Sequence, residues 1–158
     1  MNNKNVHFSS DNMKYETPQH LFDKLDKEFN FTLDPCCVPQ TAKCDKYFTP
    51  EDNGLQQDWS NDVVFMNPPY GRQIPKWIEK AYKESVKGAT VVCLIPSRTD
   101  TRYWHNYIFK YAAEIRFIKG RLKFGNSKNS APFPSCIVIF NNSKKTNKIK
   151  TMNRGRSD

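Results

Sequence analysis

The stretch from residue 63 to residue 95 constrains the fold more than any other part of this sequence. An apolar run at 63–66 stops at an asparagine and two prolines, and the apolar residues of 75–87 then recur at helical spacing. Gly88 stands where that helix would end, and 90–95 is a continuous apolar run that is typical of a buried strand. Strand, loop, helix and strand in this order predict a βαβ unit, in which the two strands are parallel neighbours in one sheet.

Two more helices and three more strands are predicted around this unit. Thr17 offers a capping hydroxyl and Pro18 suits a first helical turn, so a helix is expected at 18–29, and apolar spacing predicts another at 101–111. The remaining strands are predicted at 31–33, 114–118 and 135–140. Only a turn region at 120–134 joins the last two, so they are expected to be antiparallel in an otherwise mainly parallel sheet. The predicted fold class is α/β.

The length of the chain favours a single domain. A chain of 158 residues, of which 37% are hydrophobic, can bury one core but not two of ordinary size. We expect the domain at 15–140, with a flexible segment at 1–14 and a flexible basic tail at 141–158, because neither end has the apolar residues to order itself. Apolar runs are too short to span a membrane and the amino terminus lacks a signal-peptide core, so a soluble cytoplasmic protein is expected.

The cysteines predict neither a disulfide framework nor a metal site. There are five, an odd number, and Cys36 and Cys37 are adjacent, so buried reduced thiols are expected. Zinc would need short paired spacings and histidine partners, which the gap from Cys37 to Cys44 does not supply. No metal is therefore expected.

The charge of the chain favours a nucleic acid as partner. A formal net charge of +9 attracts polyanions and disfavours a protein substrate. Lys and Arg dominate the segment 144–158, so the tail is expected to add weak, salt-sensitive affinity for DNA.

Asp34 and Asn67 each stand directly after a predicted strand. In open α/β sheets ligands bind outside the carboxyl ends of strands, so both residues are expected at one crevice. Asn67 offers a side-chain oxygen and Pro68 a main-chain oxygen, and this pair could accept both hydrogens of an exocyclic amine. The lone pair of the amine nitrogen would then be localised for attack on a methyl group. Tyr70 offers a flat face for an extruded base, and Gly71 allows close backbone approach.

The residues from Asn67 to Gly71 resemble the catalytic motif of amino-group DNA methyltransferases, in which Asn67, Pro68, Pro69 and Tyr70 would form the catalytic loop. Further stretches in the range 15–140 are similar to the compact phage-type DNA N-6-adenine methyltransferases, the Dam family. These stretches are Tyr15-Glu16-Thr17-Pro18, Leu33-Asp34-Pro35-Cys36, the segment 52–59, Pro96-Ser97-Arg98-Thr99-Asp100-Thr101, Gly120-Arg121-Leu122 and Ala131-Pro132-Phe133-Pro134-Ser135.

This resemblance implies a single Rossmann-like domain with S-adenosylmethionine as methyl donor, adenine in double-stranded DNA as acceptor, and a phage or prophage origin. Cofactor contacts are implied for Thr17 and Pro18 at the methionine end, Asp34 at the amino group, and Asp58 and Trp59 at the adenine moiety. Pro35 and Asn67 complete the implied set. One departure concerns glycine, because none follows Asp34 until Gly54, whereas methyltransferases in general have a glycine-rich turn there.

Contacts with DNA are expected from two kinds of residue. Arg98 and Arg102 follow the strand at 90–95 and could hold phosphates, while two phenylalanines could either cap the core or stack on a flipped base. The full expected set is Gly71, Arg72, Arg98, Arg102, Phe124 and Phe133.

Other functions share some of these features. The Asn-Pro-Pro-Tyr loop also serves methyltransferases that act on RNA bases or on protein glutamine, and a non-catalytic DNA-binding or decoy protein could keep the scaffold. A metal-dependent nuclease could draw on the carboxylates of Glu51, Asp52 and Asp58. The preferred interpretation is a monomeric DNA adenine methyltransferase.

Overall fold

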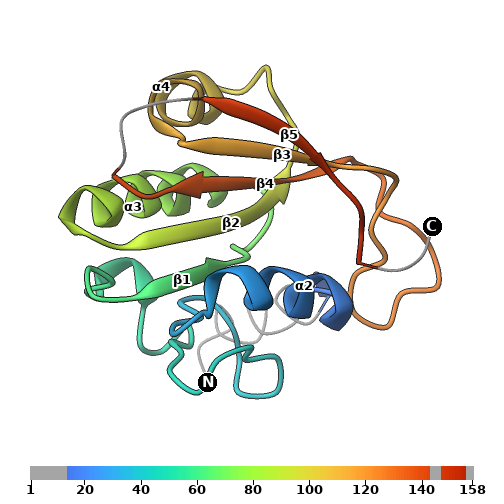
Figure 1. The fold of residues 1–158 in the computed structure, drawn as a ribbon. Helices are drawn as coiled ribbons and strands as arrows, with labels where there is room; N and C mark the ends of the chain where they lie inside the picture. Colours follow the sequence, from blue (N-terminus) through green and yellow to red (C-terminus); the bar gives the residue numbers. More distant parts are fainter. Residues whose placement is uncertain (1–13, 143–146, 156–158) are drawn as a thin grey trace.

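A single five-stranded sheet with helices on both faces forms the part of the chain that the computed structural model describes, residues 14–142 and 147–155 (Figure 1). Its strands are β1 (Val63–Met66), β2 (Thr90–Pro96), β3 (Glu114–Ile118), β4 (Ser135–Phe140) and β5 (Lys148–Met152), in the order β1-β2-β4-β3-β5. β4 is antiparallel to β2 and β3, while β1 is parallel to β2 and β5 to β3. The predicted α/β class, the mainly parallel sheet and the antiparallel pair of β3 and β4 are confirmed.

Two helices cover opposite faces of the sheet (Figure 1). Alternate residues of β2 supply the two cores, because side chains of a strand point to opposite faces in turn. Val92 and Leu94 pack with the buried residues of α2 (Gln19–Phe29), and Val91 and Cys93 pack with those of α3 (Ile74–Lys87). The central strands β2 and β4 are thus buried on both sides, as is usual where helices cover both faces of a sheet.

The βαβ unit forms where the sequence predicted it. α3 has Pro75 in its first turn, and Gly88 ends it with a φ of 128°, a conformation that favours glycine. β1 and β2 pair in parallel from Val63 opposite Thr90. Asn67 therefore leaves the carboxyl end of β1, at the edge of the sheet where ligands bind in this class of fold.

The predicted strand at 31–33 is reduced to two isolated bridges. Leu33 pairs with Val64, and Asp34 pairs with Tyr47. The pairing stops there because Pro35 has no N–H to donate to a ladder. Asp34 is nevertheless delivered beside β1, as expected.

The carboxyl-terminal part departs further from the sequence prediction. The helix expected at 101–111 is confirmed over residues 102–111, where its middle is the π-helical stretch η2 (Trp104–Ile108) and its last turn is α4 (Phe109–Tyr111). Residues 148–152 of the predicted flexible tail form β5 instead, which pairs with β3 and buries Met152 in the α2-side core. Residues 1–13, 143–146 and 156–158 of the predicted flexible ends lie outside the described residues. Of the helices that are described, none is long and apolar enough to cross a membrane.

Candidate active site

The side chain of Asn67 is held in one orientation by two acceptors. Its Nδ2 donates to the main-chain oxygen of Tyr15 at 2.7 Å and to the hydroxyl oxygen of Thr17 at 3.0 Å. A carbonyl oxygen can only accept, so the amide nitrogen must face Tyr15 and Oδ1 must face the other way. Oδ1 is buried and has no hydrogen-bond partner among the described residues. An unpaired buried acceptor costs about 1–3 kcal/mol, which is a reason to expect a ligand donor there.

Thr17 does not cap a helix, contrary to the sequence prediction. α2 begins at Gln19 with Pro18 at the N-cap position, and no side chain bonds to the free backbone N–H groups there. The Thr17 side chain is buried and turned toward Asn67 instead. The Thr17 hydroxyl, which the sequence pattern assigned to the helix end, therefore accepts a hydrogen bond from Asn67 instead.

The main chain of the predicted catalytic loop is anchored as well. The Cys36 thiol donates to the main-chain oxygen of Asn67, with 3.1 Å between Sγ and O. Burial raises the pKa of the Cys36 thiol well above its ordinary value, so the sulfur keeps the proton that it donates. Pro68 and Pro69 are buried beside it. The loop is therefore fixed through both its side chain and its backbone before any substrate arrives.

Asp34 is a buried carboxylate next to this loop. Only 4% of the residue is exposed, its Oδ2 accepts from the Lys43 N–H at 3.1 Å, and its Oδ1 accepts from the Cys36 N–H at 3.4 Å. Burial raises the pKa of Asp34 to about 6, and the two backbone N–H groups limit that rise. Near neutral pH the group is ionised, and the described residues place no full positive charge in hydrogen-bonding contact with it.

Gly54, from a later loop, packs closely against the turn that follows Asp34. A side chain at Gly54 would put its Cβ 2.1 Å from the main-chain oxygen of Pro35, a distance that no residue other than glycine allows. The turn after Asp34 is thus packed against a glycine from a later loop. Sequence reasoning missed this contact, and the available signal was that Gly54 is the first glycine after Asp34.

Two cavities border the catalytic loop. The inner cavity, with a volume of about 20 Å³, is lined by residues that include Thr17, Asp34, Lys43, Asn67 and Pro68. The outer cavity, with a volume of about 550 Å³, is lined by residues that include Tyr70, Gly71, Arg72, Arg98 and Phe133. Tyr15 lines both cavities, so it stands between them.

An aromatic cluster closes one side of the outer cavity. The ring centroid of Tyr15 lies 4.7 Å from that of Tyr70, and Phe124 and Phe133 contact Tyr70 edge-on at 5.8 and 5.6 Å. Burial raises the pKa of Tyr70 well above its ordinary value, so its hydroxyl stays neutral. Both phenylalanines that the sequence singled out therefore meet the loop tyrosine, and the Tyr15 ring covers it.

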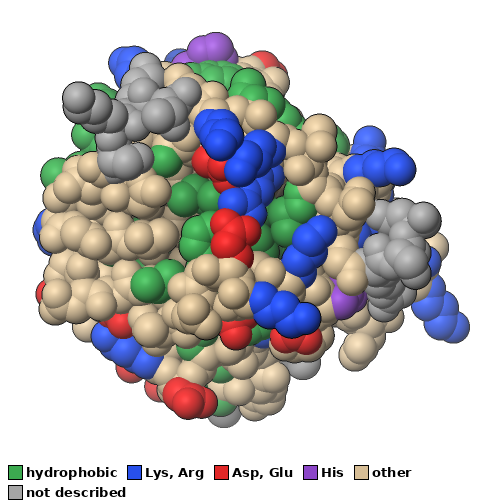
Figure 2. Space-filling model, viewed as in Figure 1, with side chains coloured by type: hydrophobic (Ala, Val, Ile, Leu, Met, Phe, Trp, Pro, Cys, Tyr) green, Lys and Arg blue, Asp and Glu red, His purple; other side chains and the backbone are tan. Residues whose placement is uncertain are grey.

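The predicted arginines are only partly brought together. Arg72 and Arg98 are exposed and line the outer cavity, with the Arg98 guanidinium 5.7 Å from the centre of the Phe133 ring. Arg102 is exposed but does not line it. Elsewhere, cations over β5 and α2 are interleaved with acidic side chains (Figure 2), as in the ion pair of Arg116 with Glu28. Arg72 and Arg98 are thus the predicted cations that the outer cavity presents.

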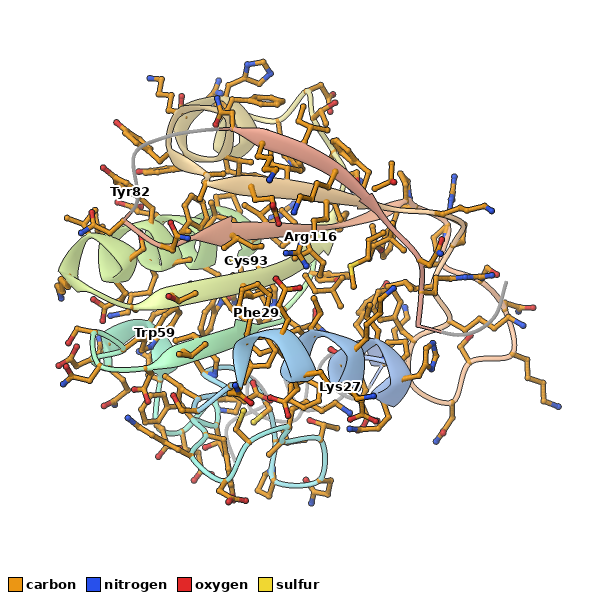
Figure 3. The ribbon with its side chains drawn as sticks, viewed as in Figure 1. Lys27, Phe29, Trp59, Tyr82, Cys93 and Arg116 are labelled. Carbon is orange, nitrogen blue, oxygen red and sulfur yellow. The ribbon has the colours of Figure 1, made fainter. Side chains whose placement is uncertain are left out.

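Asp58 and Trp59 lie apart from both cavities. Trp59 is fully buried, donates its Nε1–H to the Gly54 oxygen at 3.0 Å and stacks on Trp77. It precedes β1 and so lies at the end of that strand opposite to Asn67 (Figure 3). Asp58 accepts from the Ser60 N–H at 2.9 Å on the surface. The structure does not bring this pair to the other predicted cofactor residues.

Two of the three carboxylates named for a nuclease, Asp52 and Asp58, accept hydrogen bonds within turns. Asp52 Oδ2 accepts from the N–H of Thr49 at 2.8 Å, and Asp58 holds Ser60 as described above. Within residues 14–142 and 147–155, no group of three or more His, Cys, Asp or Glu side chains is arranged to hold a metal ion. The described part of the chain therefore offers no support for that alternative.

Comparisons with known proteins point to one family. A family model described as DNA N-6-adenine-methyltransferase (Dam) matches residues 5–157. A protein of Haemophilus phage HP1 named DNA N-6-adenine-methyltransferase is 31% identical over 140 residues, which cover 83% of this chain and 80% of that protein. A protein of the same name from Escherichia phage T1 is 27% identical over 68% of this chain, but the match spans only 45% of the T1 protein.

A solved structure shares the fold. It is described as a class I S-adenosylmethionine-dependent methyltransferase from Listeria monocytogenes, and it superimposes with a TM-score of 0.53. The match covers 89% of this chain and 66% of that one at 11% sequence identity. This likeness concerns the arrangement of helices and strands, which is that of a Rossmann-like methyltransferase domain.

Proposed function

Because the chain belongs to the DNA N-6-adenine-methyltransferase (Dam) family, we propose that it transfers a methyl group from S-adenosylmethionine to the exocyclic amine of adenine in double-stranded DNA. The observation that carries the proposal is the Oδ1 atom of Asn67, which is buried, fixed in direction and without a partner among the described residues. That atom can accept a hydrogen bond, and the exocyclic amine of adenine can donate one.

The catalytic loop activates the amine by accepting its hydrogens. Asn67 Oδ1 accepts one hydrogen and the Pro68 main-chain oxygen accepts the other, so the nitrogen lone pair is withdrawn from the ring and directed toward the methyl donor. The bound cofactor supplies a methyl group on a positively charged sulfur. On transfer the nitrogen would gain the methyl carbon, the cofactor would leave with a neutral sulfur, and the amine would lose one proton to water. Oriented dipoles in a rigid loop carry this step without a shifted general base.

The outer cavity is the proposed site of the flipped adenine. Its volume of about 550 Å³ suits a base with its sugar, and Tyr70 presents the ring on which the base would stack. In the structure Tyr15 covers that ring, at 4.7 Å between centroids. The incoming base would therefore displace the Tyr15 side chain and take over its contacts with the aromatic cluster. Because Tyr15 also lines the inner cavity, this displacement would open the way for the amine to reach Asn67 and Pro68 there.

The residues of the inner cavity fit the methionine end of the cofactor. Asp34 is a buried carboxylate and a suitable partner for an ammonium group, and Thr17 and Asn67 add polar groups beside it. The cavity of about 20 Å³ is too small for the ligand as it stands, so its lining must open when the cofactor enters. Pro18 and Pro35 adjoin this lining, whereas Asp58 and Trp59 do not belong to the proposed site.

Duplex DNA would be held by cations at the mouth of the outer cavity. Arg72 and Arg98 are exposed there, with Gly71 allowing close approach of a phosphate, and the net charge of +9 adds affinity that does not depend on sequence. Since two of the relatives come from phages, we also propose that this chain is of phage or prophage origin. A monomer in the bacterial cytoplasm is part of the same proposal and rests on the sequence expectations alone.

The test is transfer of labelled methyl from S-adenosylmethionine to unmethylated duplex DNA, followed by nucleoside analysis. The natural sequence should place label on N-6-methyladenine, and Asn67→Ala should abolish the transfer. Asn61→Ala, which changes an exposed asparagine before β1, is the matched control and should keep full activity. DNA binding without transfer by the natural sequence would favour the decoy alternative, and label on RNA but not on DNA would favour an RNA methyltransferase.

A further inference from the structure

Lys43 is a second charged group of the inner cavity, and the proposed reaction does not use it. Its side chain is only 7% exposed although lysine is usually solvated. The ammonium contacts Gln19 Oε1 at 2.9 Å and Glu16 Oε1 at 3.4 Å, while the backbone N–H of the same residue donates to Asp34 Oδ2 at 3.1 Å. A buried cation and a buried carboxylate thus stand side by side in one cavity lining.

We propose that Lys43 binds the carboxylate of the cofactor's methionine moiety while Asp34 binds the ammonium group on the same carbon. The inference rests on the proposed function, because it assumes that S-adenosylmethionine enters the inner cavity. An α-amino acid presents both charges on substituents of one carbon, and the backbone hydrogen bond from Lys43 N–H to Asp34 Oδ2 holds the two residues together in one cavity lining. The pair is therefore a receptor for a zwitterion.

The charges of the lining support this arrangement. Asp34 and Glu16 are negative and Lys43 is positive, so these three residues together carry one negative charge when ionised. S-adenosylmethionine carries one net positive charge, because its sulfonium adds to the balanced ammonium and carboxylate. The product loses the sulfonium charge. The lining thus complements the methyl donor better than the product, which helps product release.

In the structure the side chains of Glu16 and Gln19 accept hydrogen bonds from the ammonium of Lys43. Gln19 begins α2 and Glu16 precedes it, so Lys43 also fastens this segment to the loop after Asp34. When a ligand carboxylate arrives it would share or replace the weaker contact, that with Glu16 at 3.4 Å. A purely structural role for Lys43 is the alternative that an experiment must separate.

The test compares two ligands by isothermal titration calorimetry on the full chain. S-adenosylmethionine has the carboxylate, and decarboxylated S-adenosylmethionine lacks it while keeping the amine and the sulfonium. Lys43→Met should weaken binding of the first ligand by about 10- to 100-fold, the usual effect of losing a hydrogen bond to a charged group. It should leave binding of the second ligand unchanged, and Lys43→Arg should restore most of the lost affinity. Asp34→Asn should weaken both ligands, since both present the amine.

The outcomes separate the inference from the proposed function. Equal losses for both ligands, or no loss for either, would overturn the role of Lys43 while leaving the methyl donor in place. If the natural sequence binds neither ligand, the proposed function fails and the inference fails with it. The melting temperature of Lys43→Met should be measured in parallel, because a loss of fold would weaken both ligands alike.

Discussion

Thr17 holds the amide of Asn67 with a hydroxyl that has no part in the helix beside it. Thr17→Val keeps the shape of the side chain and removes this bond, leaving Asn67 Nδ2 with the Tyr15 oxygen alone. We expect kcat for methyl transfer to fall about tenfold, as the loss of one hydrogen bond from a catalytic group would produce. Thr17→Ser should keep most of the activity. A weaker affinity for S-adenosylmethionine with unchanged kcat would show instead that Thr17 acts on the cofactor.

The buried carboxylate of Asp34 makes cofactor binding depend on pH. Burial raises the pKa of Asp34 to about 6, so the group is neutral below that pH and cannot pair with an ammonium group. We expect the affinity for S-adenosylmethionine to fall about tenfold per pH unit below pH 6 and to level off above it. Calorimetric titrations across this range should show the dependence, and Asp34→Asn should abolish it together with most of the affinity.

The same group affects stability with the opposite sign. A carboxyl whose pKa is higher in the folded than in the unfolded protein stabilises the fold when protonated, and this contribution is lost as pH rises through about 6. This rise corresponds to a cost of about 3 kcal/mol when the group is ionised. A cofactor amine that pairs with Asp34, as proposed, would offset part of that cost.

At the scale of residues, the sequence predicted which polar side chains lie at the carboxyl edge of the sheet. It did not predict which residues from distant loops pack against them. Asn67, Tyr70 and Asp34 could be predicted because proline-terminated strands deliver them to one edge of the sheet. Gly54 and Lys43 could not, because each meets Asp34 or its neighbour only through the path of a long loop. Local rules also misassigned the Thr17 hydroxyl, since a tertiary partner outcompeted the helix end.

The sequence predicted best those helices and strands that have regular apolar spacing and a proline, glycine or turn at their ends. β1, β3 and β4 begin and end at the predicted residues, and α3 starts one residue early, because an apolar run or helical spacing is bounded there by proline, glycine or a turn. β5 was missed since only Met152 of its five residues is buried. Its place depends on backbone pairing with β3, which composition does not reveal.

A truncation tests whether β5 supports the domain. Ending the chain at residue 147 removes the pairing with β3, the buried Met152 side chain and the ion pair of Lys150 with Glu114 at 3.0 Å. We expect the melting temperature to fall by about 5 °C, corresponding to about 2 kcal/mol at this chain length. A chain ending at Gly155 keeps β5 and should melt like the full protein. Equal melting of both truncated chains would contradict a stabilising role for the strand.

The charge of the whole molecule predicts how DNA binding responds to salt. With a net charge of +9, affinity should fall steeply as salt rises, because cations on the protein release counterions from the phosphates. Arg72→Gln and Arg98→Gln should each reduce the slope of log affinity against log salt by about 0.9 if each arginine holds one phosphate. Lys83→Gln, at an exposed lysine paired with Glu79 on α3, should leave the slope unchanged. Equal slopes for all three variants would contradict the proposal that Arg72 and Arg98 bind phosphates at the mouth of the outer cavity.

Tyr15 contributes to both cavities. Its main-chain carbonyl orients Asn67, and its ring covers Tyr70. Entry of the cofactor must open the lining on one side of this residue, and entry of the base must displace its ring on the other. We therefore expect the two binding equilibria to be thermodynamically linked. The ligand that binds first provides the free energy needed to move Tyr15, which lines both cavities. Reciprocity then requires that DNA changes the affinity for S-adenosylmethionine by the same factor by which S-adenosylmethionine changes the affinity for DNA.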